Sequence, residues 1–157
     1  MNTHFTAQIC KNGHVITEYY ENSDNKKPFC DQCGEPTITQ CEDCQTNIQG
    51  EHREGFPSLH YNAPRYCYNC GQPFVWTKRS IEAASELADE LDELNQEEKE
   101  ILKASITSLT KNGPQVQVAK NRFMRIMKKV GKESADAMRS ILVDIMSEAV
   151  KKSIYGT

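Results

Sequence analysis

The stretch "CDQCGEPTITQCEDC", residues 30–44, contains two Cys-x-x-Cys pairs, and a third pair follows as "CYNC" at residues 67–70. A Cys-x-x-Cys turn offers two thiolates from a single bend of the chain, and Zn²⁺ binds four such ligands in a tetrahedron. Three pairs in so short a stretch therefore predict a part of the chain that is organised by bound metal.

The cysteine count leads to a second half-site. The chain has seven cysteines, and the three pairs leave Cys10 over, in "CKNGH". Three pairs supply one and a half zinc sites, and adding Cys10 and His14 completes two. Glycine follows two of the pairs, at Gly34 and Gly71. The tight turn around a Cys-x-x-Cys pair, called a zinc knuckle, needs a positive φ at this position. The predicted ligands are Cys10, His14, Cys30, Cys33, Cys41, Cys44, Cys67 and Cys70.

Two groupings of these ligands are possible. In the sequential grouping, Cys10, His14, Cys30 and Cys33 hold one zinc and the other four cysteines hold the second, each within a ribbon built on a short hairpin. The expected strand pairs are 15–20 with 27–30, and 46–51 with 64–67. In the crossed grouping the pairs at 30–33 and 41–44 share a metal, since only seven residues separate them.

Other chemistry for the same residues is possible but less favoured. His52 or His60 could replace His14 as the ligand. A thioredoxin-like redox pair would need a βαβ setting and would explain one pair only. An iron–sulfur cluster is a further alternative. Four protein ligands per zinc leave no position for substrate, and the sequence offers no clear catalytic arrangement elsewhere, so we expect a protein that is not an enzyme.

Composition changes near Trp76. Residues 1–76 hold all seven cysteines and all four histidines, whereas residues 77–157 are rich in Ala, Leu, Ile, Met, Glu and Lys. We therefore predict an α+β chain with a tandem zinc-ribbon module at 1–76 and a helical domain at 77–157. Neither a membrane-spanning apolar run nor a secretory leader is recognisable, which predicts a cytoplasmic protein with reduced thiols.

The second domain is expected to contain about four helices. The first begins near Thr77 or Ser80, the second near Asn95, and the third spans about 114–130 and opens with Pro114. The fourth is expected at 133–154. Its apolar arc covers about half of its circumference, which suggests a second partner, including another copy of the chain.

Charge is segregated in this domain. Residues 82–100 hold nine acidic residues and one basic residue, whereas residues 111–132 hold seven basic residues and no acidic one. The acidic and basic helices are expected to lie near each other. The alternative is a nucleic-acid site on the basic helix, using Arg122, Arg125, Lys128 and Lys129, although residues 1–76 are themselves acidic overall.

The motif order "CKNGHVI", "FCDQCGEPTI", "CEDCQTNIQG" and "PRYCYNCGQPFVWT", followed by a helical tail, resembles a group of uncharacterised bacterial proteins with tandem zinc-ribbon motifs. The resemblance covers essentially the whole chain. It implies a bacterial cytoplasmic protein and the same eight ligands, and it implies no activity.

The sequence therefore predicts a non-enzymatic, zinc-stabilised adaptor that holds two zinc ions. Its zinc module would present loops and aromatic side chains to a protein partner, and its helical tail would dock or oligomerise. A nucleic-acid-binding accessory protein is the alternative, and a redox or zinc sensor is a less favoured one.

Overall fold

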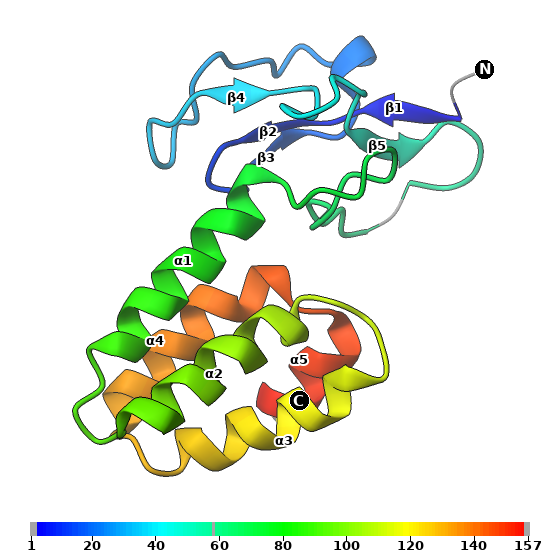
Figure 1. The fold of residues 1–157 in the computed structure, drawn as a ribbon. Helices are drawn as coiled ribbons and strands as arrows, with labels where there is room; N and C mark the ends of the chain where they lie inside the picture. Colours follow the sequence, from blue (N-terminus) through cyan, green and yellow to red (C-terminus); the bar gives the residue numbers. More distant parts are fainter. Residues whose placement is uncertain (1–2, 58, 156–157) are drawn as a thin grey trace. The chain divides into compact units, whose positions relative to one another are not determined.

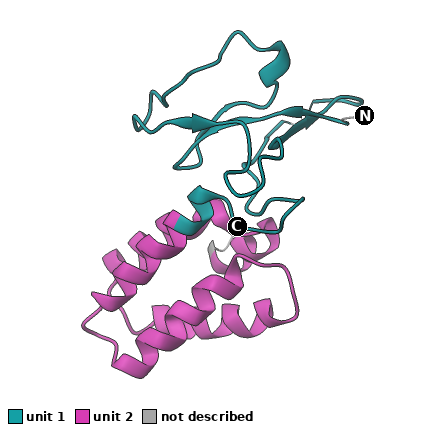
Figure 2. Ribbon diagram, turned by 45° about the horizontal axis from the view of Figure 1, so that its top comes forward, with its two compact units in different colours: residues 1–78 teal, residues 79–157 magenta. Residues whose placement is uncertain are grey.

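The computed structural model describes residues 3–57 and 59–155, and the chain divides into two compact units, residues 1–78 and 79–157 (Figures 1 and 2). Small antiparallel sheets form the first unit, and five α-helices follow, so the predicted α+β class is confirmed. The division lies two residues after the predicted domain boundary, within helix α1 (Val75–Asp89).

The first unit contains two small sheets. Strand β1 (His4–Thr6) pairs antiparallel with β5 (Gln49–His52). Strand β2 (Gln8–Cys10) lies between β3 (Val15–Thr17) and β4 (Thr37–Ile38), antiparallel to both. A short 3-10 turn, η1 (Tyr20–Asn22), follows β3. The apolar core is small, and besides cysteines it consists of Ala7, Ile9, Ile48, Phe74 and Trp76.

Both predicted strand pairings are wrong, for one physical reason. Each Cys-x-x-Cys turn folds the chain back on itself, so the residue before the turn pairs with the residue after it. The bridges are Phe29 with Pro36, Gln40 with Asn47, and Tyr66 with Pro73. The segments 27–30 and 64–67 therefore pair within their own knuckles. The partners of β3 and β5 come instead from residues 4–10, where no strand was expected.

The second unit is helical. After α1 come α2 (Gln96–Leu109), α3 (Gln115–Met127), α4 (Lys132–Leu142), a 3-10 turn η2 (Val143–Ile145) and α5 (Glu148–Tyr155). The predicted start of α2 is confirmed, because Asn95 and Glu98 form a reciprocal capping box. Helix α3 follows Pro114 as expected. The buried side chains form one continuous apolar core, centred on Leu102, Ile106, Phe123, Met138 and Leu142.

Helix α1 begins earlier than predicted. Its first residue is Val75, and the Lys78 N–H donates to the Phe74 carbonyl. Thr77 is not a cap: its side chain is fully buried, and its hydroxyl donates to the Arg65 carbonyl at 2.9 Å. The hydroxyl thus binds a backbone carbonyl of the first unit and not an N–H at the helix end. A capping rule that took Thr77 as the cap therefore placed the start of α1 too late.

The predicted fourth helix is broken. Met146 has extended backbone angles, with φ −100° and ψ 152°, and the Val150 N–H donates to Ser147 Oγ, as at an ordinary helix start. The apolar side chains on both sides of the break are buried inside the unit: Met138, Leu142, Ile145, Met146, Val150 and Ile154. Packing inside the unit therefore explains the wide apolar arc. The arc is no longer evidence that this part of the chain packs against a second copy.

Candidate metal centres

The three Cys-x-x-Cys turns share one backbone geometry. In each, the N–H of the first cysteine donates to the carbonyl five residues later, at 2.8–2.9 Å. The N–H four residues after that cysteine donates back to its carbonyl at similar length. These bonds close a tight loop, and they require a positive φ at the residue four positions after the first cysteine: 77° at Gly34, 60° at Gln45 and 75° at Gly71.

Gln45 is the knuckle position that the glycine pattern does not reveal. A non-glycine residue in this left-handed conformation costs about 1 kcal/mol relative to ordinary backbone. Its side-chain amide donates to the Glu42 carbonyl at 3.0 Å, which ties it to its own turn. The knuckle geometry is therefore kept without glycine.

The Cys10–His14 turn is built in the same manner. The Cys10 N–H donates to the His14 carbonyl at 3.0 Å, and the Gly13 N–H donates to the Cys10 carbonyl at 2.8 Å. Gly13 has φ 92°, and a Cβ added there would lie 3.2 Å from the Trp76 Cβ. Both the conformation and the contact with Trp76 therefore require glycine.

The structure brings Cys10, His14, Cys30 and Cys33 together as the first cluster. His14 Nδ1 lies 3.4 Å from Cys10 Sγ and 3.5 Å from Cys30 Sγ. Cys10 Sγ lies 3.7 Å from Cys33 Sγ. The ring nitrogen that faces the three sulfurs is thus Nδ1.

The second cluster holds Cys41, Cys44, Cys67 and Cys70. Cys41 Sγ lies 3.8 Å from Cys70 Sγ, and Cys44 Sγ lies 3.7 Å from Cys67 Sγ. In each cluster the ligand atoms all lie within 4.8 Å of one another. The ligands are therefore grouped sequentially, and the crossed grouping of the pairs at 30–33 and 41–44 does not occur.

The spacings fit zinc. Tetrahedral bonds of about 2.3 Å to sulfur and 2.0–2.1 Å to nitrogen place two sulfurs about 3.8 Å apart, and a sulfur and a nitrogen about 3.5 Å apart. The distances in both clusters agree with these edges. A disulfide would bring two sulfurs to about 2.05 Å, and all seven cysteines are free thiols.

Proton affinity within the clusters is uneven. A hydrogen bond from the Glu35 N–H lowers the pKa of Cys33 to about 6, and hydrogen bonds with the side chain and backbone of Thr46 lower the pKa of Cys44 to about 6. Burial raises the pKa of Cys10 to about 11. The three thiols of the first cluster and the four of the second cannot all ionise side by side without a compensating cation, and a divalent metal removes this obstacle.

Further hydrogen bonds reach the sulfurs from outside the ligand sets. The His14 N–H lies 3.3 Å from Cys10 Sγ, and the Gln32 N–H lies 3.4 Å from Cys30 Sγ. The Asn69 side-chain amide donates to Cys44 Sγ at 3.6 Å. Such donors orient thiolates and stabilise their charge. With four protein ligands each, the two centres can tie the chain together but leave no position for a substrate.

The remaining histidines lie outside both clusters. His4 and His52 face each other across the β1–β5 pair, with ring centroids 4.9 Å apart. His60 lies exposed in the segment between β5 and α1. Neither His52 nor His60 is close enough to replace His14 in the first cluster.

The basic residues of α3 and of the two positions that follow it are only partly neutralised. Lys129 forms an ion pair with Glu98 of α2, as expected for neighbouring acidic and basic helices. Arg122, Arg125 and Lys128 are exposed, and none of them forms an ion pair with any other residue in the described ranges. The structure thus leaves three basic side chains exposed, two on α3 and one at its C-cap, Lys128.

One protein family, described as "Uncharacterized protein conserved in bacteria (DUF2321)", matches residues 3–154, nearly the whole chain. Neither a curated protein nor a solved structure matches significantly. Within the described residues, no helix combines the length and the apolar character needed to cross a membrane.

Proposed function

We propose that this chain, which belongs to the family of uncharacterised proteins conserved in bacteria (DUF2321), is a non-enzymatic adaptor whose zinc centres hold a protein-binding surface in shape. Zinc, when bound, would cross-link segments that have little apolar core of their own. Because reduced thiols are needed to hold it, we place the adaptor in the cytoplasm.

The observation that carries this proposal is a pair of large apolar side chains exposed on the loop between Arg53 and Tyr61. Phe56 is 100% exposed and Leu59 is 95% exposed. Side chains of this kind are usually buried, and neighbouring ones left in water mark surfaces that bind other proteins. Phe29 and Tyr68 add further exposed aromatic surface beside the knuckles.

The two ends of this loop are anchored. The Arg53 N–H donates to the Thr3 carbonyl at 2.8 Å, and its guanidinium lies 3.4 Å from a Glu21 carboxylate oxygen. At the other end, the Tyr61 hydroxyl donates to the Gln49 carbonyl, and burial raises the pKa of that hydroxyl. Binding costs less free energy when a loop is already held in place, because fewer residues must become ordered. The anchored ends therefore favour binding by the side chains between them.

The double variant Phe56→Ser, Leu59→Ser tests this role. Tagged wild type and variant are purified from a bacterium that carries the family, and bound proteins and zinc are quantified by mass spectrometry. We expect a partner that is enriched with wild type and depleted at least tenfold with the variant, at equal zinc content, because burial of two large apolar side chains is lost. Equal recovery of every bound protein by both would refute the proposal.

Arg122, Arg125 and Lys128, which form no ion pair among the described residues, support a second candidate, binding of nucleic acid. Each phosphate contact releases counterions, so three contacts with duplex DNA give a slope of about −2.7 in a plot of log affinity against log salt. The exposed α3 face also carries Gln115, Gln117 and Asn121, whose amides suit phosphate and base contacts.

Charge reversal at these positions separates the two candidates. In fluorescence anisotropy with a duplex oligonucleotide at low salt, Arg122→Glu, Arg125→Glu, Lys128→Glu should abolish binding if α3 is the site. Lys129 is left intact, since its reversal would oppose Glu98. The control Lys26→Glu, on the first unit, should change nothing. Undetectable binding by wild type, or equal binding by the triple variant, rules this candidate out.

A further inference from the structure

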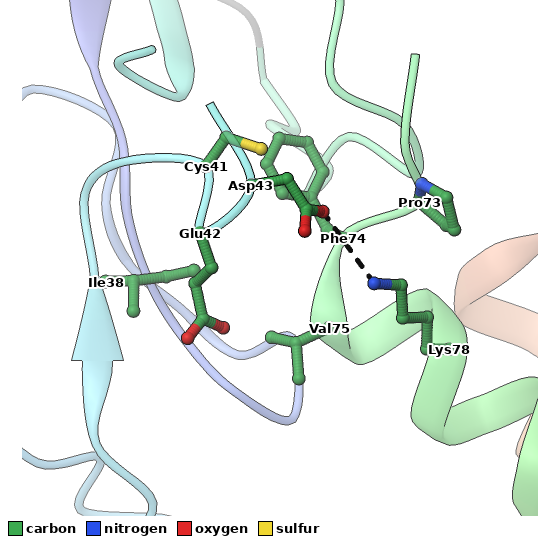
Figure 3. A pocket seen from close by; sticks show the side chains of 8 residues that line it. All are labelled: Ile38, Cys41, Glu42, Asp43, Pro73, Phe74, Val75 and Lys78. Atoms are coloured by element: carbon green, nitrogen blue, oxygen red, sulfur yellow. Dashed lines mark ion pairs between the residues drawn. The ribbon is translucent and has the colours of Figure 1, made fainter. Parts of the chain in front are cut away.

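We propose that a pocket beside the second metal centre receives an arginine side chain of a protein partner. The inference deepens the adaptor function proposed above and rests on it. The pocket has a volume of about 240 Å³, and its walls come from the 41–44 knuckle, the end of β4 and the start of α1 (Figure 3). All of its lining residues belong to the first unit.

The lining of the pocket combines apolar and charged residues. Ile38, Pro73, Phe74 and Val75 supply the apolar part. Phe74 is buried and stacked on Trp76, with ring centroids 4.7 Å apart, so this wall is held in place. Pockets for drug-sized ligands span about 300–1,000 Å³, so this smaller one suits a single long side chain.

The charges around the pocket favour a cation. Glu42, Asp43 and Cys41 of the second cluster line the pocket, and the two carboxylate side chains are about half exposed. Lys11 pairs with Glu42 at 3.2 Å, and Lys78 pairs with Asp43 at 3.7 Å. Four zinc-bound thiolates keep two negative charges after the metal is counted. With both carboxylates and both lysines included, the surroundings remain negative by about two charges.

Lys78 already shows where an incoming cation would sit. It reaches from α1 toward Asp43 across the pocket (Figure 3). Both members of this pair are about half exposed, and ion pairs in that setting contribute little, so a partner can displace the lysine at small cost. A guanidinium fits better than an ammonium, because it binds a carboxylate through two parallel hydrogen bonds while its methylene stem covers apolar surface.

The probe for this site is N-acetyl-arginine amide, titrated into the zinc-loaded full chain and followed by ¹H–¹⁵N NMR. We expect saturable shifts at the amides of residues 38, 42, 43, 75 and 78. The citrulline analogue has the same shape without the charge, and it should bind at least tenfold more weakly. Equal binding of the two probes, or preferential binding of N-acetyl-glutamate amide, overturns the proposal.

Two substitutions on opposite walls should shift the affinity in opposite directions. Asp43→Asn removes a carboxylate and should weaken binding of the arginine probe about fivefold. Lys78→Met removes the internal competitor and should strengthen it about threefold. Asp24→Asn, an exposed acid elsewhere in the first unit, is the matched control and should change nothing. Zinc content verifies that each variant is folded, and weaker binding by Lys78→Met contradicts the proposal.

The pocket and the adaptor role can fail separately. If the partner retained through Phe56 and Leu59 binds Asp43→Asn as tightly as wild type, the pocket inference fails and the adaptor role stands. If the arginine probe binds as described but no protein depends on Phe56 and Leu59, the adaptor role fails and the pocket remains a site for cationic side chains.

Discussion

His14→Ala should lower the bound zinc from about two ions per chain to about one, measured by metal analysis after dialysis against a competing chelator. His14 Nδ1 faces the sulfurs of Cys10 and Cys30 at 3.4 and 3.5 Å, where a tetrahedral zinc needs its fourth ligand. Three thiolates with water in the fourth position hold the metal far more weakly. Residues of the second cluster should keep their NMR positions.

His60→Ala is the matched control, since His60 is an exposed histidine in the same unit and lies outside both clusters. It should retain about two zinc ions under the same dialysis. Two zinc ions in His14→Ala would show that another group completes the first centre. Loss of both ions would show that the two centres are not independent.

The ligand sets were the most predictable part of this protein. Zinc requires four ligands, so counting Cys10 and His14 with the three pairs was enough to name eight ligands for two sites, while the sequential and the crossed grouping both stayed open. The structure places the ligand atoms in the sequential grouping. This rule is local to each turn and to the metal, and it depends little on the rest of the fold.

The strands could not be predicted in the same way. They are two to four residues long, so alternation of apolar and polar residues carries almost no signal over them. Their register is set by the knuckles and by side chains such as Gln8. Its amide donates to the Lys27 carbonyl and accepts from the Lys27 N–H, which attaches residues before the first Cys-x-x-Cys pair to β2.

The break before α5 did have a signal in the sequence. Ser147 followed by Glu148 is a common helix start, and a serine there competes with continuation of the preceding helix. The long apolar periodicity from 133 to 154 masked it, because the buried side chains continue through the turn at Ile145 and Met146. Gln45 had no such signal, since only the backbone geometry shows that it replaces a glycine.

Removal of zinc should unfold the first unit and leave the second helical. The single tryptophan makes this measurable: Trp76 is 4% exposed, it stacks on Phe74, and its indole N–H donates to the Pro64 carbonyl at 2.8 Å. After chelation we expect its fluorescence to shift to the red as water reaches it. Circular dichroism at 222 nm should keep most of its intensity, because most helical residues lie in 79–157.

The physical reason lies in the unequal cores of the two units. The first unit has five buried apolar side chains besides its cysteines, and bound zinc would contribute on the order of 10 kcal/mol per site, more than so small a core can supply. The second unit has a continuous core of its own. Adding back Zn²⁺ should restore the Trp76 emission, whereas Mg²⁺, which prefers oxygen ligands, should not. Emission that stays unchanged after verified metal loss would contradict a structural role for zinc, and a parallel loss of the 222 nm signal would show that the helices depend on the metal as well.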